Sequence, residues 1–144
     1  MPGEKGLTKR EFLDKEGILL SPTTGNSMNP FLKEGDVAVI EKKEGRLSLS
    51  DVAFYVREEK LLLHRVIKVE EGGYLIRGDN TYIDEYVEEK DVLGVMIERI
   101  RKGEHLFPSD KRWKRYAERS LKTYSIRKFF FSVKQKIKRI LKLK

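Results

Sequence analysis

Short apolar runs separated by turn residues fill most of the chain up to Arg101. Runs of this length, bounded by glycine, asparagine and charged pairs, predict β-strands rather than helices. The predicted strands cover residues 18–20, 37–40, 51–56, 61–69, 74–77 and 92–100, the last of them interrupted by Gly94. Because no long helical pattern alternates with these runs, the sequence favours a mainly β fold, a small barrel or sandwich, over a parallel βαβ sheet.

Two segments between the predicted strands have the composition of hairpin turns. Glu58–Lys60 predicts the tip of one hairpin. Gly72–Gly73 predicts a second turn, of the kind that accepts positive φ angles.

Helical patterns are confined to the two ends of the chain. Thr8 to Glu11 has the Thr-x-x-Glu spacing of a capping box, which predicts a short helix that ends at Gly17. Pro108 to Asp110 predicts a linker and a helix cap, followed by a helix over 111–123. A second helix is predicted over 125–144, where apolar residues recur with helical spacing at 126, 129, 130, 133, 137, 140 and 141.

The formal net charge of +8 is divided unevenly along the chain. Residues 111–144 hold 14 Lys and Arg and one acid, Glu118, so their net charge is +13. Residues 1–110 hold 17 Lys and Arg and 22 Asp and Glu, which gives a net charge of −5. An acidic body with a basic end indicates two parts with different roles. We therefore divide the chain into a domain over 1–108 and a basic helical tail over 109–144.

Composition narrows the range of possible chemistry. A chain of 144 residues with 39% hydrophobic residues can bury one modest core. The sequence has no cysteine, which excludes disulfides and thiolate chemistry, and with two histidines we expect no structural zinc site. It also contains no phosphate-binding Gly-Lys-Ser/Thr loop. We expect neither a metal nor another cofactor.

No run of about 20 apolar residues occurs in the sequence, so we expect no membrane-spanning helix. The first residues, Met1 to Lys5, do not lead into the apolar run of a secretion signal. We therefore expect the protein to be cytoplasmic or held peripherally at a membrane surface.

The loop between the first two predicted strands has the residues of a tight, exposed bend. Gly25 accepts backbone angles that other residues avoid, and Pro30 restricts its own φ and the conformation of Asn29. Such a bend would hold Ser27 on a corner, as a nucleophile requires, although a serine in this setting is by itself most often a simple turn residue. We expect Met28 and Phe31 to pack into the core beneath the bend.

A serine hydroxyl needs an adjacent base to act as a nucleophile at neutral pH. His64 suits this role because its ordinary pKa lies near ~6.5 and it lies inside a predicted strand. The alternative is a buried histidine bonded to a backbone carbonyl. His105 is expected to face solvent in a linker. The acids available to orient His64 are Asp79, Asp84 and Glu85, although an aspartate in Gly-Asp-Asn is also typical of a turn.

Four short segments follow one another along the chain in an order that is typical of a known family. They are Ser27-Met28-Asn29-Pro30, Gly35-Asp36, His64-Arg65-Val66, and Gly78-Asp79-Asn80 followed by Asp84. Over about Ile18 to Arg101 these segments resemble the type I signal peptidases and the self-cleaving SOS-response repressors. The His-Arg-Val segment is similar to the Ser-His branch, the archaeal and endoplasmic-reticulum type. Most signal peptidases differ from this chain in carrying a membrane-spanning segment before the Ser-Met-x-Pro segment.

The resemblance implies a Ser-His mechanism with a supporting acid. Ser27 would be the nucleophile and His64 the base, with Asp84 favoured as the orienting acid and Asp79 as a supporting one. In the Ser-His branch this acid lies about six residues after the Gly-Asp-Asn aspartate, a position that Glu85 occupies here. The choice among the three acids therefore stays open.

The resemblance also bears on how a negatively charged intermediate would be stabilised. Signal peptidases often carry an oxyanion-binding hydroxyl two residues before the nucleophile, and here that position is Gly25, as in the repressors. The backbone N–H of Ser27 would then do most of this work, helped by Thr24 or Asn26.

Two functional hypotheses from different classes remain. The first is a serine endopeptidase that cleaves a leader or signal-like segment from a polypeptide substrate. The alternative is a non-catalytic binding module with a peptidase fold, whose basic tail binds membrane or nucleic acid. The repressors read DNA through a helix-turn-helix, but only about 17 residues precede the first predicted strand, so DNA recognition through the N-terminus is not expected and nucleic acid is not the favoured partner. Binding of polyanions by the basic tail stays open. The presence of both Ser27 and His64 favours the enzyme.

The predicted helix over 125–144 joins an apolar stripe to a lysine-rich face, a pattern typical of helices that lie in a membrane interface. One interpretation is therefore peripheral membrane contact through these residues, and another is that they bind a polyanion or a partner protein. The alternative is that the stripe packs onto the barrel.

Overall fold

The computed structural model describes residues 8–142. Its elements are α1 (Lys9–Glu16), β1 (Ile18–Pro22), β2 (Val37–Lys42), β3 (Val52–Arg57), β4 (Lys60–Val69), β5 (Gly73–Arg77), β6 (Glu85–Glu88), a 3₁₀ turn (Glu89–Asp91), β7 (Val92–Arg101), β8 (Glu104–Leu106), α2 (Lys111–Lys122) and α3 (Tyr124–Lys142).

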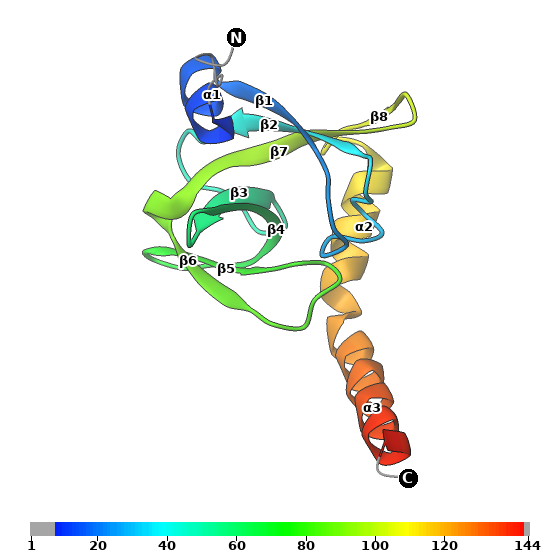
Figure 1. The fold of residues 1–144 in the computed structure, drawn as a ribbon. Helices are drawn as coiled ribbons and strands as arrows, with labels where there is room; N and C mark the ends of the chain where they lie inside the picture. The colour runs from blue at the N-terminus through cyan, green and yellow to red at the C-terminus, as the bar shows by residue number, and fades with distance from the viewer. Residues whose placement is uncertain (1–7, 143–144) are drawn as a thin grey trace, which may run out of the picture.

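Within that range, eight antiparallel strands form one curled sheet. The strand order is β1-β2-β7-β3-β4-β5-β6, and β8 pairs with β7 outside this path. Figure 1 shows the sheet wrapping into a half-barrel, with α1 beside β1 and β2, and α2 along one side. The predicted mainly β fold is confirmed.

Local capping signals define the first helix. The Thr8 hydroxyl accepts a hydrogen bond from the Glu11 N–H at 3.1 Å, and Gly17 ends the helix at φ 80°. Both ends agree with the capping-box prediction. Leu13, on the inner side of α1, is buried and fixes the helix to the core.

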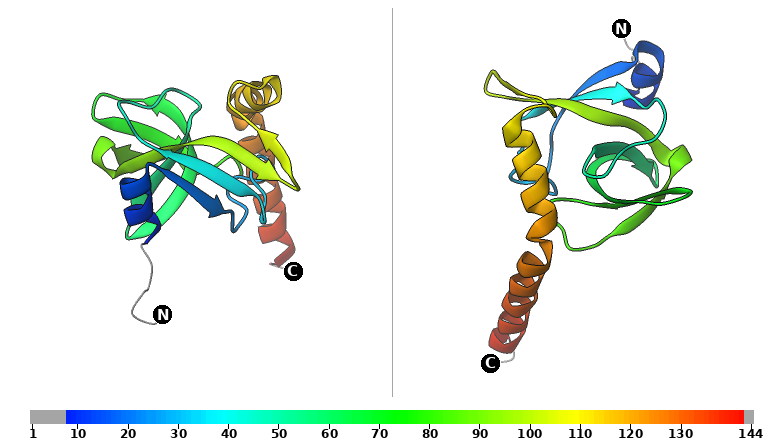
Figure 2. Two further views of the ribbon diagram at one scale, coloured as in Figure 1. Left: turned by 90° about the horizontal axis from the view of Figure 1, so that it is seen from above. Right: turned by 180° about the vertical axis from the view of Figure 1, so that it is seen from behind.

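Two clusters of buried apolar side chains form the core. The first joins the loop after β1 to α2, where Phe31 meets Trp113 edge to face with 4.8 Å between ring centroids. Met28 and Phe31 are 3% and 1% exposed, which confirms their predicted burial. The second cluster lies among β3, β4 and β5 and includes Tyr55 and Tyr74. Because α2 adds Trp113 to the first cluster, it packs along the barrel, as Figure 2 shows.

The structure contains two strands that the sequence pattern does not predict, β6 and β8. Each buries a single residue, Val87 in β6 and Leu106 in β8, so neither has an apolar run. His105 lies in β8 rather than in a linker. Its side chain is 51% exposed and pairs with Glu98.

The hairpin at Gly72–Gly73 is present, but its conformation differs from the prediction. The glycines with positive φ in the described chain lie elsewhere. A Cβ on Gly73 would lie 2.2 Å from the Val87 carbonyl oxygen, so the close approach of β6 accounts for this glycine. Positive φ angles occur instead at Glu58 and Glu59, at the tip between β3 and β4.

The predicted second tail helix is present as α3, which continues beyond α2 and projects away from the barrel (Figures 1 and 2). Within residues 124–142 no side chain is buried, so the apolar stripe does not pack onto the barrel. Over residues 8–142, no helix combines the length and the apolar character needed to cross a membrane. Positions 143–144 of the predicted helix, and the N-terminal residues used to exclude a secretion signal, lie outside the described residues.

Candidate active site

The loop after β5 is built against the loop that carries Ser27. The Asn80 N–H donates to the Ser27 carbonyl oxygen at 2.8 Å, and Asn80 Nδ2 donates to the Asn26 carbonyl oxygen at 3.0 Å. A Cβ on Gly78 would lie 2.7 Å from the Ser27 carbonyl oxygen, so only glycine fits there without movement. Gly25 adopts φ +79°, which favours glycine. The Gly-Asp-Asn segment therefore fixes the bend over residues 25–30 that carries Ser27, which we call the serine bend.

A chain of hydrogen bonds begins at Ser27. Its Oγ lies 3.0 Å from Nε2 of His64, and Nδ1 of His64 lies 2.7 Å from the Tyr55 hydroxyl oxygen. The Tyr55 hydroxyl in turn donates to Oε1 of Glu85. The second oxygen of Glu85 accepts from Arg57 Nη1 at 2.7 Å. Three strands, β3, β4 and β6, thus supply a continuous polar chain that ends at the serine hydroxyl.

Strand register explains why Tyr55 reaches His64. The β3–β4 hairpin pairs Ala53 with His64, and Tyr55 lies two residues further along β3, on the same face of the sheet. Sequence reasoning missed Tyr55. The signal that would have found it is the hairpin tip at Glu58–Glu59, because counting back from that tip gives this register.

The positions of the protons in this hydrogen-bond chain follow from the Glu85 carboxylate at one of its ends. A carboxylate can only accept hydrogen bonds, so the single Tyr55 hydroxyl proton is directed to Glu85. The Tyr55 oxygen must then accept the Nδ1–H of His64. This leaves the Nε2 lone pair of His64 free to accept the Ser27 hydroxyl proton. The geometry therefore selects the histidine tautomer that a general base requires.

Burial and charge reinforce this protonation state. Burial lowers the pKa of His64 below its ordinary 6.5, and the nearby Glu85 carboxylate opposes this effect only in part. Burial and the hydrogen bond to Glu85 raise the pKa of Tyr55 far above its ordinary 10. At neutral pH His64 is therefore neutral and Tyr55 keeps its proton. This is the resting state from which a serine proton can be accepted.

The structure does not bring all the predicted acids to His64. Asp84 pairs with Arg77 Nη1 at 3.1 Å, and in the part of the chain that the structure describes Glu85 is the acid beside His64, at 4.0 Å from Nδ1. The expected contact of Asp84 with His64 is therefore not found. Asp84 precedes β6, whereas Glu85 is its first residue, and neighbouring residues of an extended chain point in opposite directions.

Asp79 has a different set of partners. Its two carboxylate oxygens accept from Nε and Nη2 of Arg65 at 2.7 and 2.8 Å, and the Ser120 hydroxyl adds a bond at 3.1 Å. The Arg65 and Asp79 side chains are 1% and 2% exposed. Asp79 therefore supports the site through the loop that it holds rather than through direct contact with the His64 ring.

A cavity of about 160 Å³ opens beside the serine. Ser27 and His64 line it together with apolar side chains from the bend and from β3 and β4, among them Met28, Phe54 and Leu63. Thr24 and Gly25, two of the predicted oxyanion-site residues, also line this cavity. The third, Asn26, lines a separate hollow on the outer side of the bend with Lys33 and Glu34.

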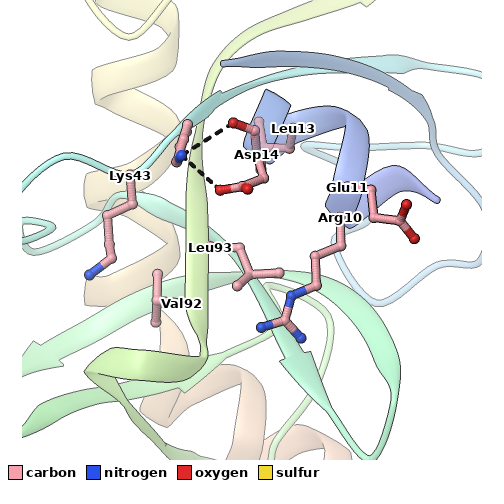
Figure 3. Close-up of a pocket in the computed structure, with 8 residues that line it drawn as sticks. Arg10, Glu11, Leu13, Asp14, Lys43, Val92 and Leu93 are labelled. Carbon is pink, nitrogen blue, oxygen red and sulfur yellow. Dashed lines mark hydrogen bonds and ion pairs between the residues drawn. The ribbon is translucent and has the colours of Figure 1, made fainter. Parts of the chain in front are cut away.

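A third hollow, of about 440 Å³, lies between α1 and the start of β7 (Figure 3). It is lined by Arg10, Asp14 and Leu93 among others, and Lys42 closes one side through a 2.7 Å ion pair with Asp14. Its lining holds no serine or histidine, so of these two cavities the one beside Ser27 is the one that has a nucleophile and a base. Over residues 8–142, no three His, Cys, Asp or Glu side chains are grouped so as to hold a metal ion.

The fold and the site together give a β domain in which a serine and a histidine lie within hydrogen-bonding distance. The family model described as Peptidase S24-like matches residues 7–97, which include the serine bend, β4, the Gly-Asp-Asn loop and Glu85. The chain belongs to the Peptidase S24-like family. This agrees with the resemblance to the signal peptidases and SOS repressors. A search of curated proteins finds no match.

Proposed function

We propose that the protein is a serine endopeptidase in which Ser27 is the nucleophile and His64 the general base. The observation that supports this most is the chain from Ser27 through His64 and Tyr55 to Glu85. Membership of a peptidase family adds weight, although that family also includes non-catalytic members. The proposal therefore rests on the arrangement of the side chains more than on the family.

The reaction would proceed in two acyl-transfer steps. His64 Nε2 accepts the Ser27 hydroxyl proton while Oγ bonds to the scissile carbonyl carbon, and the carbonyl oxygen becomes an oxyanion. The imidazolium returns this proton to the leaving amine as the C–N bond breaks, which leaves an acyl-serine. A water molecule then attacks the ester carbonyl while His64 accepts one of its protons. As the ester C–O bond breaks, the imidazolium returns that proton to Oγ, which releases the acid product and regenerates Ser27 and neutral His64.

Tyr55 and Glu85 serve as positioning residues in this scheme. The Tyr55 oxygen holds the His64 ring by its Nδ1–H, and Glu85 keeps the Tyr55 proton directed away from the ring. Glu85 also lies 4.0 Å from Nδ1 of His64, so its negative charge stabilises the imidazolium that forms during the reaction. The acid thus acts partly through the tyrosine and partly through its charge.

The oxyanion would be bound by the backbone N–H of Ser27, helped by the hydroxyl of Thr24, a residue that lines the same cavity. Gly25, between them, holds the left-handed conformation of the bend. One such donor contributes about 10²- to 10³-fold to the rate.

The substrate that fits best is an extended polypeptide segment, such as a leader or signal-like sequence. The cavity beside Ser27 is small and largely apolar on the side of β3 and β4, which favours small apolar side chains near the scissile bond. β1 is the terminal strand of the sheet, and its Ser21 and Pro22 reach the cavity. An extended substrate can therefore lie along this edge in the manner of an added strand.

The test is cleavage of peptides by the purified protein. We would incubate it with peptides encoded by neighbouring genes and with a proteome-derived peptide library, and identify new termini by mass spectrometry. We expect new termini with the parent protein and with Ser109→Ala, an exposed serine outside the site, but none with Ser27→Ala. Identical products from parent and Ser27→Ala would favour the alternative, a non-catalytic module with a peptidase fold.

A further inference from the structure

α3 is an unusually exposed helix. It spans 19 residues, about 28 Å at 1.5 Å per residue, and within residues 124–142 it buries no side chain. Figure 1 and the right-hand view of Figure 2 show it projecting from the barrel, with its C-terminal end far from the sheet. An isolated helix with large apolar side chains in water is poorly stabilised unless another surface covers them.

The exposed apolar residues of α3 share one side. At 100° per residue they fall within an arc of about 120°. Their exposed fractions run from 37% to 65%, and the residues are Ile126, Phe129, Phe130, Val133, Ile137, Ile140 and Leu141. We call this set the apolar stripe of α3. It runs from the second residue after the start of the helix to its last turn.

The contacts of α3 with the barrel come from the other side of the helix. Phe131 stacks on Tyr82 with 4.6 Å between ring centroids, and Tyr124 lies under the Arg77 guanidinium at 3.2 Å. Arg127 Nη1 donates to the Asp79 carbonyl oxygen at 2.8 Å. By helical periodicity these three helix residues lie outside the arc of the apolar stripe. The stripe therefore faces away from the body of the protein.

Charge identifies the surface that would cover the stripe. α3 carries seven Lys and Arg and no Asp or Glu, and all seven lie outside the arc of the stripe: Arg127, Lys128, Lys134, Lys136, Lys138, Arg139 and Lys142. An apolar stripe flanked by cations matches a bilayer interface, where acyl chains meet anionic headgroups. A polyanion such as nucleic acid would engage the cations but leave the phenylalanines in water.

We propose that α3 docks in the interface of an anionic lipid bilayer, with the apolar stripe towards the acyl chains and the cations among the headgroups. The base of α3 is fixed to Asp79 through Arg127, and Asp79 precedes Asn80, which bonds to the serine bend. Docking would therefore hold the Ser27 cavity at a set position relative to the membrane. The inference about docking stands independently of any catalytic activity.

Vesicle co-sedimentation of the full chain tests the proposal. We expect binding to vesicles of phosphatidylcholine with phosphatidylglycerol, weak binding to phosphatidylcholine alone, and a decline as salt increases. The double substitution Phe130→Ser and Ile137→Ser should lower the partition coefficient by roughly tenfold or more. Both residues are more than half exposed, so circular dichroism and thermal unfolding should stay close to those of the parent.

The matched control is Leu49→Ser, which removes an apolar side chain of similar exposure, 54%, from a loop of the barrel. It should leave vesicle binding unchanged. Equal binding by the parent and the α3 double variant would overturn the proposal, as would failure of the parent to bind anionic vesicles. If sedimentation velocity instead shows a dimer that the double variant abolishes, a second copy covers the stripe and the proposal is wrong. Binding to duplex DNA or RNA but not to vesicles would also contradict it.

Discussion

Two carboxylate–arginine pairs lie at β4, one that contains Arg65 and one beside the neighbouring His64. They differ in burial and in the hydrogen bonds that they make. Both carboxylate oxygens of Asp79 accept hydrogen bonds from Arg65, and the Asp79 and Arg65 side chains are 2% and 1% exposed. One carboxylate oxygen of Glu85 accepts a hydrogen bond from Arg57 and the other accepts one from Tyr55. The Glu85 and Arg57 side chains are 21% and 50% exposed. His64 and Arg65 point to opposite faces of the strand, so each pair serves one face.

The comparison separates support of the fold from support of the chemistry. A buried carboxylate whose oxygens are both held by one guanidinium stabilises the structure, and replacing it leaves an unpaired buried charge. A partly exposed carboxylate with one oxygen free for a hydrogen-bond chain can respond to a charge that forms on a histidine. We therefore expect mutations of the first pair to lower stability and mutations of the second to lower the rate.

The largest expected effect is on the reacting pair itself. Ser27→Ala should lower kcat/KM by about 10⁴- to 10⁶-fold, and His64→Ala by a similar factor, with the double variant no worse because the two residues act as a unit. Unfolding of Ser27→Ala should match the parent, since the bend is held by backbone contacts with Asn80. The measurement is peptide cleavage with chemical denaturation in parallel. Activity of Ser27→Ala within tenfold of the parent would refute the mechanism.

The next effect concerns the acid. Glu85→Gln and Tyr55→Phe should each lower kcat/KM by about 10²-fold or more, with ~10⁴ as the upper guide from an asparagine at the acid of a Ser-His-Asp triad. Asp84→Asn should stay within about twofold of the parent, because its carboxylate pairs with Arg77. A large rate loss in Asp84→Asn beside a mild one in Glu85→Gln would reverse this assignment.

Mutation of the buried Asp79–Arg65 pair should change the free energy of unfolding. Asp79→Asn should lower the free energy of unfolding by about 3 kcal/mol or more, because Arg65 is left as a buried charge without its partner. Glu85→Gln should cost under about 1 kcal/mol, as expected for a partly exposed pair. Urea unfolding of both variants measures the contrast. Equal losses would remove the distinction between the two pairs.

A smaller effect is expected from pH. Only neutral His64 can accept the serine proton, and burial lowers the pKa of His64, so kcat/KM should rise with pH through an apparent pKa below 6.5 and level off near neutrality. Between that pKa and 6.5 the unfolded chain binds more protons than the folded one. The contribution of His64 to stability is therefore complete above 6.5 and falls as pH decreases through this window. A rate midpoint above 7 would contradict this prediction.

Sequence reasoning found the serine and the histidine because their segments carry local signals, a constrained bend and a His-Arg-Val strand. It missed Tyr55, whose role depends on strand register rather than on neighbouring residues. It favoured Asp84 over Glu85 because β6, with one buried residue, gave no signal from which to infer the direction of either side chain. It predicted α3 but not its exposure, since an apolar stripe is satisfied equally by a barrel or by a membrane.

The most direct test of the hydrogen-bond chain is the tautomer of His64, read by ¹⁵N NMR without any substrate. The chain has two histidines, so His105→Gln assigns the signals. We predict that at neutral pH His64 is neutral and protonated on Nδ1, with a bare Nε2 and a titration midpoint below 6.5. Tyr55→Phe should weaken this preference. A His64 protonated on Nε2, or charged at neutral pH, would contradict the proposed role of His64 as the base for Ser27.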